Sequence, residues 1–125
     1  MLANAPVAAV VAVSDMAKGK EFYEGTLGLQ KADMDDPGGI LYVCGMDSRI
    51  LVYESQFAGT NKATSITWMV DDAEVTVKEL KAKGIAFEHY DFPGMTRKGD
   101  IHIAGKSKAA WFKDPDGNIL AVVSG

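Results

Sequence analysis

The sequence feature that most constrains the fold is a hairpin signal near the C-terminus. The stretch Asp114-Pro115-Asp116-Gly117-Asn118 separates two apolar runs. Pro115 presets φ for the second position of a type I turn, and Gly117 supplies the left-handed residue that returns the chain. If the ends of the stretch close the hairpin, Trp111 lies opposite Ala121 and shares its face. Both faces of this hairpin are apolar, so the sequence predicts a covering layer on each.

Upstream of the hairpin, the chain repeats one order of elements: a strand, a helix and then further strands. A polar residue caps each predicted helix, Ser14 or Asp15 in the first half and Asp71 or Asp72 in the second. The first half predicts a helix up to residue 28 and strands at about 7–13, 30–34, 40–44 and 49–55. The second half predicts a helix up to residue 84, strands at 65–70 and 85–90, and a long loop over 91–108 before the hairpin.

The two halves can be aligned on each other without gaps in two blocks. The first block places Val13-Ser14-Asp15 on Val70-Asp71-Asp72. The second places residues 49–55 on residues 118–124, so that Val52 falls on Ala121. Continued toward the N-terminus, the second block puts Tyr42 in the place of Trp111. We therefore expect Tyr42 and Val52 to share a face, as Trp111 and Ala121 do.

Composition and charge narrow the class of protein. With 125 residues and 47% apolar content, the chain can bury a core as one domain. Its net charge of −4 and its scattered basic residues argue against nucleic acid or an anionic membrane as a partner. The single cysteine, Cys44, and an N-terminus without signal-peptide features lead us to expect a cytoplasmic protein. No apolar run approaches the roughly 20 residues that span a bilayer.

Two motifs resemble those of a known superfamily. The first is Val-x-Val-x-Asp followed by Phe-Tyr and Leu-Gly-Leu, over residues 11–29, and the second is Phe-x-Asp-Pro-Asp-Gly-Asn, over residues 112–118. With the repeat, they resemble the vicinal oxygen chelate superfamily of glyoxalases, extradiol dioxygenases, and fosfomycin and bleomycin resistance proteins. The resemblance implies an α+β fold of two tandem βαβββ modules, at about 6–56 and 64–125 of one domain. Their curved mixed sheets would enclose a cleft, with the helices on the outer side.

Metal-binding members of that superfamily carry ligands at defined strand positions. One lies at the second or third residue of each module's first strand, and one lies midway along each module's last strand. Carried onto this sequence, the resemblance implies Ala8 and Ser65, then Val52 and Ala121. Methyl groups, an isopropyl group and a neutral hydroxyl are not usual ligands of a divalent cation, and a shift of one residue offers no better donors. We therefore expect no metal and no cofactor.

Strand alternation predicts which side chains face the cleft. The expected ligand-binding residues are Tyr42, Val52, Glu54, Ser65, Thr67, Met69, Trp111 and Ala121. Trp68, Phe112 and Leu51 are expected to pack under the helices. Tyr42 and Trp111 would then form aromatic walls of an apolar slot that suits a small planar molecule. The polar anchors would be Glu54, Ser65 and Thr67. The alternative is that the side chains interdigitate and leave no cavity.

The sequence supports three interpretations of function. The first is a metal-free protein that binds a small apolar or aromatic molecule, as the superfamily's drug-sequestering resistance proteins do. The second is a lyase or dioxygenase of the same superfamily with a non-standard site, in which other residues hold a metal or Glu54 or His102 acts as a general base. The third is an interaction domain, or a homodimer subunit whose cleft is completed by a second chain. The loop over 92–105 is long enough to close over such a cleft.

Overall fold

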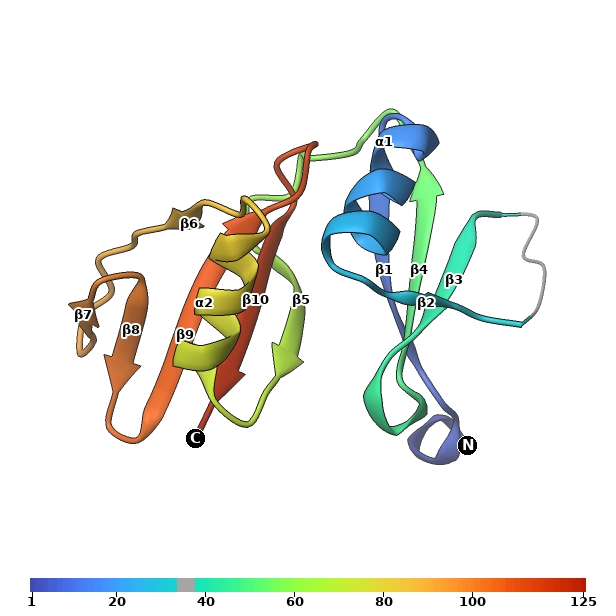
Figure 1. Cartoon of the computed structure of the whole chain (residues 1–125). Coiled ribbons are helices and arrows are strands. Elements are labelled where there is room, and N and C mark those ends of the chain that lie inside the picture. The colour runs from blue at the N-terminus through green and yellow to red at the C-terminus, as the bar shows by residue number, and fades with distance from the viewer. Residues whose placement is uncertain (34–37) are drawn as a thin grey trace.

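The computed structural model describes residues 1–33 and 38–125, which form two β-sheets with a helix packed on each (Figure 1). The first half builds a four-stranded sheet in the order β1-β4-β3-β2. Its strands are β1 (Ala8–Val13), β2 (Gln30–Lys31), β3 (Ile40–Val43) and β4 (Arg49–Glu54). β1 runs parallel to β4, and the other neighbours are antiparallel. The short helix η1 (Leu2–Asn4) precedes β1, and η3 (Gly45–Asp47) forms the turn between β3 and β4.

The second half builds a sheet in the order β5-β10-β9-β8-β7, with β6 paired to β9. Its strands are β5 (Thr64–Met69), β6 (Phe87–Glu88), β7 (Thr96–Lys98), β8 (Ile101–Ala104), β9 (Ser107–Lys113) and β10 (Ile119–Ser124). β5 runs parallel to β10, as β1 does to β4, so the repeated α+β order predicted from the sequence is present.

The prediction of a long loop over 91–108 was wrong. This region contains the antiparallel hairpin of β7 and β8 and the first residues of β9. Strands as short and polar as Thr96–Lys98 are held by pairing with a neighbour rather than by an apolar pattern of their own. The strand predicted at 85–90 is shorter, since only β6 pairs there. β2 coincides with the start of the strand predicted at 30–34. The last residue of that prediction, residue 34, lies outside the described residues, as do 35–37.

Each helix begins at an aspartate that follows the first strand of its half. Asp15 caps α1 (Met16–Lys20), and Asp72 caps α2 (Ala73–Ala82). In both cases Oδ1 accepts hydrogen bonds from two backbone N–H groups of the first turn, at 2.9–3.4 Å. The sequence had left Ser14 and Asp71 open as alternatives. α1 continues as a π-helix, η2 (Glu21–Thr26).

The C-terminal hairpin has the predicted register. Trp111 pairs with Ala121, and Phe112 pairs with Leu120. The Asp114 backbone N–H donates to the carbonyl of Asn118 at 3.0 Å. Gly117 has a φ of +87°, the left-handed conformation that the turn requires.

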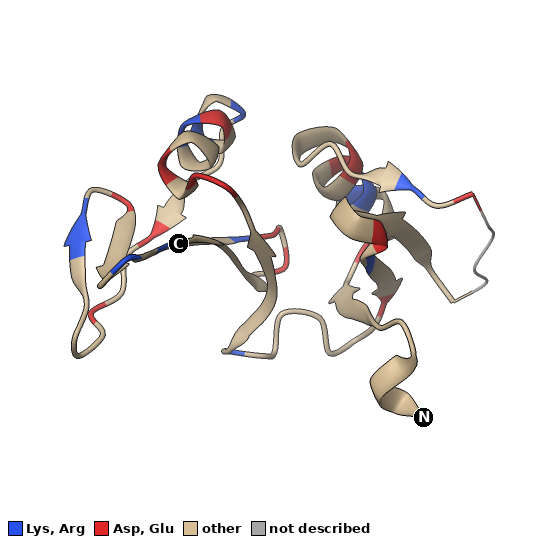
Figure 2. Ribbon diagram, turned by 90° about the horizontal axis from the view of Figure 1, so that it is seen from below, with Lys and Arg blue, Asp and Glu red and all other residues tan. Residues whose placement is uncertain are grey.

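The turn of this hairpin also joins the two halves of the chain. Asn118 Nδ2 donates to the carbonyl of Ala12 in β1 at 2.7 Å, and Asp116 accepts from the Ser14 backbone N–H at 3.1 Å. In the linker between the halves, the Gly59 N–H donates to Asn118 Oδ1 at 3.2 Å. β1 and β5 lie beside each other, but they belong to separate sheets that do not close on one another. Both helices lie on the same side of the two sheets (Figure 2).

The last strands of the two halves correspond in a register that differs by one position from the alignment of their sequences. Leu51 pairs with Val10 in β1, and Ala121 pairs with Thr67 in β5, so Leu51, not Val52, is equivalent to Ala121. Because side chains alternate along a strand, an error of one residue reverses every side chain in β3 and β4. The similarity between residues 49–55 and 118–124 therefore does not mark structurally equivalent positions.

The core lies between each sheet and its helix. In the first half, the rings of Tyr23 and Tyr42 stack with their centres 6.5 Å apart. In the second half, Trp68 stacks on Phe112 at 6.3 Å, as expected for residues under the helix. No helix within residues 1–33 and 38–125 has the length and apolar character needed to cross a membrane.

Candidate functional site

Each sheet has one face under its helix and one face turned away from it, which we call the open face. In the second half, Thr67, Ala121 and Trp111 lie side by side on the open face, in β5, β10 and β9. Met69 and Ser65 alternate with the helix-facing residues of β5 and share the face. The direction predicted for these five side chains agrees with the observed register.

Trp111 dominates the open face of the second half. Its indole Nε1 donates to the Thr64 hydroxyl at 3.1 Å, so the ring extends from β9 across β10 to the start of β5. Ala121, beneath this path, is almost completely buried. Three further rings contact the indole, and we call the four together the ring cluster: Tyr90, Phe92, His102 and Trp111. Their centres lie 5.6, 5.4 and 4.8 Å from that of Trp111, in that order.

His102 lies on β8, not in a loop as the sequence predicted. It pairs with Ala109, which places its side chain on the open face beside Trp111, and it is only 1% exposed. His102 Nε2 accepts a hydrogen bond from the Tyr90 backbone N–H at 3.0 Å. Sequence reasoning missed Tyr90 as a site residue. The available signal was the spacing of Tyr90 and Phe92, which lie two residues apart and face the same way in an extended segment.

Apolar side chains in β1 and β5, the adjacent edge strands of the two sheets, remain uncovered on the open face. Val10 is 52% exposed and Met69 is 89% exposed, although Val11 and Ile66 on the opposite face are buried. The run over residues 7–13 is apolar on both faces, a pattern typical of a strand with a covering layer on each side. The part of the chain that the structure describes supplies that layer only on the helix side.

Two predicted ligand-binding residues, Tyr42 and Val52, lie on the wrong face for that role. Both are completely buried in the core on the helix side, and the Tyr42 hydroxyl donates to the Glu24 carboxylate of η2 at 2.9 Å. Burial and this hydrogen bond raise the pKa of Tyr42 above its usual range. Leu51, expected under the helix, lies on the open face instead. The one-residue difference between the sequence alignment and the observed register explains all three errors.

Glu54 does not face the open side either. Its Oε1 accepts a hydrogen bond from the Met16 backbone N–H at 2.9 Å, at the start of α1. Ser124, at the equivalent position in β10, does the same for α2 by accepting from the Ala73 N–H at 3.0 Å. The paired contacts indicate that Glu54 completes a helix N-terminus. The prediction of a polar anchor in the cleft was wrong for this residue.

The residues do not fit a metal site of the kind that the superfamily resemblance implies. Ala8, Ser65 and Ala121 occupy three of the implied positions, and the structure replaces Val52 by Leu51 as the counterpart of Ala121. None of these side chains offers an imidazole or a carboxylate. Within residues 1–33 and 38–125, no group of three or more His, Cys, Asp and Glu side chains comes close enough to hold an ion.

Electrostatic contacts fix the segment that carries Tyr90. Asp100, in the turn between β7 and β8, accepts from Lys81 Nζ of α2 and contacts His89 Nε2, both at 2.7 Å. The hydrogen bond from Lys81, and then the one with His89, hold the pKa of Asp100 below its usual range. Burial raises the pKa of the Tyr90 hydroxyl.

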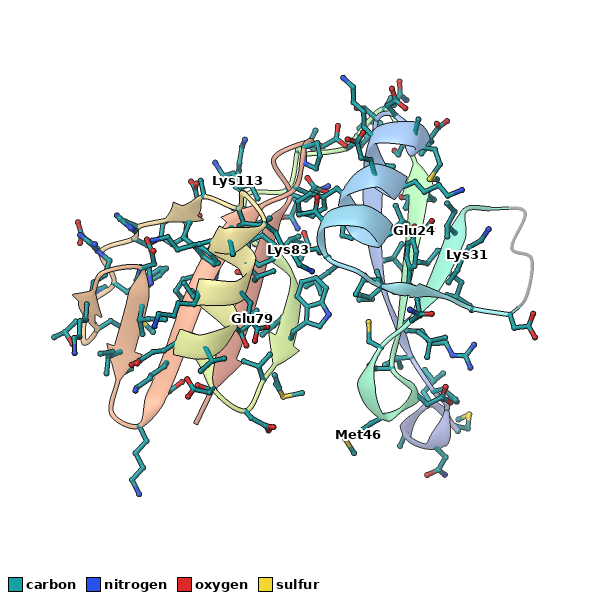
Figure 3. The ribbon with its side chains drawn as sticks, in the orientation of Figure 1. Glu24, Lys31, Met46, Glu79, Lys83 and Lys113 are labelled. Carbon is teal, nitrogen blue, oxygen red and sulfur yellow. The ribbon has the colours of Figure 1, made fainter. Side chains whose placement is uncertain are left out.

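A cavity lies on the helix side, between residues of the two halves. Its volume is about 180 Å³, and its lining is almost entirely apolar. Leu27 and Leu29 contribute from the first half, and Trp68 and Leu80 from the second. Lys83 extends from the end of α2 toward the first half at this side (Figure 3). Sequence reasoning did not predict this cavity, because it depends on how the halves pack together.

Two βαβββ units, each with its first and last strands parallel, define a glyoxalase-like fold. The family model of the Glyoxalase/Bleomycin resistance protein/Dioxygenase superfamily matches residues 6–122, and the chain belongs to this superfamily. No protein among those with curated descriptions matches the chain.

Solved structures with this fold align over nearly the whole chain. A member of the superfamily from Sphaerobacter thermophilus DSM 20745 is 22% identical, with a TM-score of 0.70 and 100% coverage of both chains. Lactoylglutathione lyase from Agrobacterium tumefaciens is 19% identical, with a TM-score of 0.69, covering 98% of this chain and 94% of the lyase. TnmS3, an antibiotic binding protein from Streptomyces sp. CB03234, is 21% identical, with a TM-score of 0.64 and 97% coverage of each chain. At these identities the similarity shows a shared fold.

Proposed function

We propose that this protein binds a small, planar, largely apolar molecule on the open face of its second half. The observation that carries the proposal is the position of Trp111, whose indole lies across the sheet toward Thr64 beside the exposed Thr67 and Met69. An indole on an apolar sheet face offers a stacking surface to an aromatic ligand. The hydroxyls of Ser65 and Thr67 add polar groups on the same face.

The proposed function is binding without chemistry and without a bound metal. It is supported by the absence of metal-donor groups at Ala8, Leu51, Ser65 and Ala121, and by TnmS3, which has the same fold and is named as an antibiotic binding protein. A lyase of the same fold gives the catalytic alternative a precedent. No contact of the two candidate bases favours it, because Glu54 completes a helix N-terminus and the Nε2 of His102 is occupied.

A thermal-shift screen against aromatic antibiotics and aromatic metabolites tests the binding proposal. A ligand that binds only the folded state raises the melting temperature by mass action. We expect Trp111→Ala to abolish that stabilisation. Phe57→Ala, which removes an exposed aromatic ring in the linker, is the matched control and should retain it. Full stabilisation of Trp111→Ala would contradict the proposal.

Elemental analysis of the purified protein tests the metal-free part of the proposal. We expect no zinc, nickel, iron or manganese in stoichiometric amount. One equivalent of any of these ions, lost on Ser65→Ala, would show that the open face holds a metal after all.

We further propose that a second copy of the chain covers the open faces. Val10 and Met69 form an exposed apolar surface in strands whose other faces are buried, and such surfaces are typical of interaction sites. Sedimentation velocity should show a dimer, and Val10→Lys should shift it toward the monomer. Val75→Lys, at an exposed valine of α2, is the matched control that should leave the dimer intact. A monomeric unmodified protein would contradict this proposal.

A further inference from the structure

The hydrogen bonding of His102 fixes its tautomer. A backbone N–H can only donate, so Nε2, which receives the Tyr90 N–H at 3.0 Å, carries a lone pair rather than a proton. The neutral imidazole then carries its proton on Nδ1. His102 therefore presents one N–H donor, at Nδ1, to its surroundings.

That donor has no acceptor. His102 Nδ1 is buried and has no hydrogen-bond partner within residues 1–33 and 38–125. The Tyr90 hydroxyl, in the same ring cluster, is likewise buried and unpaired in the described part of the chain. Buried polar groups in folded proteins nearly always have a partner, because an unpaired one has lost its hydrogen bonds to water and gained none in the protein. Two unpaired polar groups in one cluster indicate that a partner is supplied from outside the chain.

Phe92 is the exposed member of the ring cluster and lies beside His102 and Trp111. Its ring lies 6.3 Å from that of His102 and 5.4 Å from that of Trp111, centre to centre, and it is 42% exposed. A phenyl ring beside His102 offers no good hydrogen-bond acceptor. Phe92 extends from an irregular segment between β6 and β7. Its displacement therefore breaks no strand pairing.

We propose that the ligand of the open face takes the place of the Phe92 ring and accepts a hydrogen bond from His102 Nδ1–H. This inference rests on the proposed function and narrows the ligand class to planar aromatic molecules that carry a carbonyl or another neutral acceptor oxygen. Such a molecule retains the ring contacts that Phe92 makes with Trp111 and adds the hydrogen bond that Phe92 lacks. The Tyr90 hydroxyl can donate or accept, so it does not narrow the class further.

Chromone and naphthalene test the inference as a pair. Both are planar bicycles, but only chromone has a carbonyl oxygen. In a Trp68→Phe background, Trp111 is the single tryptophan, and its fluorescence reports binding of each probe. In this background we expect chromone to be preferred over naphthalene. His102→Phe should reduce that preference by about three- to tenfold, the contribution of one hydrogen bond to binding. Phe57→Ala, at the exposed ring in the linker, should leave the ratio unchanged.

Phe92→Ala tests the displacement. Removal of the competing ring should raise the affinity for both probes, and weaker binding of both would overturn the inference. Because His102→Phe changes a buried residue, imidazole ¹⁵N spectra of the unmodified protein provide an independent measurement. Chromone should shift the His102 Nδ1–H signal, and naphthalene should not change its hydrogen bonding.

The outcomes separate this inference from the proposed function. Equal binding of both probes, an unchanged affinity ratio in His102→Phe and an Nδ1 signal insensitive to chromone would overturn the inference and leave open-face binding standing. Failure of both probes to perturb Trp111 would overturn both.

Discussion

The Tyr23 hydroxyl donates a hydrogen bond to Asp114 Oδ2 at 2.8 Å, and this contact joins the helical segment of the first half to the hairpin turn of the second. Asp114 Oδ1 also accepts from the backbone N–H groups of Asp116 and Asn118, and Oδ2 accepts from Asn118 Nδ2. The aspartate that closes the turn therefore also fixes the relative position of the halves. Burial, and then the neighbouring Asp114 charge, raise the pKa of Tyr23 above its usual range, which favours the protonated hydroxyl that donates this hydrogen bond.

Tyr23→Phe should lower the free energy of unfolding by about 1.5–3 kcal/mol. The substitution removes a buried hydrogen bond to a carboxylate and leaves the ring in place. Urea denaturation measures the loss. Tyr42→Phe also removes a hydroxyl that donates to a carboxylate, but its partner, the half-buried Glu24, belongs to the same half of the chain. It should lower the free energy of unfolding by less. An equal decrease in the free energy of unfolding in the two variants would show that the hydrogen bond between the halves stabilises the protein no more than one within a half.

Gly59→Ala should destabilise the protein more than Gly94→Ala. Both glycines have positive φ, at +74° and +81°, so each alanine costs about 1–2 kcal/mol for its backbone conformation alone. At Gly59 the added methyl group would also overlap the backbone carbonyl of Asp116, whereas nothing lies near Gly94. Thermal unfolding of the two variants gives the comparison. A Gly59→Ala protein as stable as Gly94→Ala would mean that the linker is free to move away from the turn.

Glu54→Ala should cost about 0.5–2 kcal/mol of stability and leave ligand binding unchanged. The carboxylate satisfies the N–H of Met16 at the start of α1, as a helix cap does. Chemical denaturation of this variant measures the change in stability, and a binding titration of the same variant measures its ligand affinity. Loss of binding with stability intact would instead assign Glu54 a role in the ligand site.

Asp100→Asn should make the protein less stable at neutral pH and less sensitive to acid. Because the hydrogen bond from Lys81 holds the folded pKa below the ordinary value of 3.8, the ionised carboxylate favours the folded state above that pH. This contribution is lost as the pH falls below 3.8 and through the lower folded pKa. The difference in unfolding free energy between the two proteins should therefore shrink over that range in acid denaturation. A constant difference down to strongly acidic pH would show that Asp100 is not paired in solution.

The sequence predicted the hairpin and the repeat because their signals are local. Pro115 and Gly117 specify the turn, and the turn fixes the pairing of Trp111 with Ala121. The two capping aspartates marked the helix starts for the same reason. The family resemblance, carried by those stretches, agrees with the match over residues 6–122.

The faces of β3 and β4 were not predictable from the same evidence. Ile50-Leu51 resembles Ile119-Leu120, which favoured an alignment of Leu51 with Leu120, but Leu51 is the counterpart of Ala121. Both faces of β4 carry apolar side chains, so hydrophobic alternation could not correct the slip of one residue. Tyr42, Val52 and Glu54 were assigned to the wrong face as a result.

The ring cluster depends on contacts between distant segments. His102 is adjacent to Trp111 only because β8 pairs with β9, and Tyr90 reaches them through an irregular segment after β6. From the sequence alone, Tyr90, Phe92 and His102 lie in or next to the region predicted as a loop, and nothing brought them to Trp111. The sequence did place Trp111, Thr67 and Met69 on one face, because the turn of the C-terminal hairpin fixed which side chains of its strands share a face.

The two tryptophans give the most direct test of the central claim, since they lie on opposite faces of one sheet. A ¹H–¹⁵N spectrum resolves their indole N–H signals, and chromone is the ligand to titrate. We predict that the Trp111 signal, whose N–H bonds Thr64 on the open face, shifts in proportion to bound chromone, while the Trp68 signal stays in place. A shift of Trp68 alone would place the ligand in the helix-side cavity between the halves and contradict the claim.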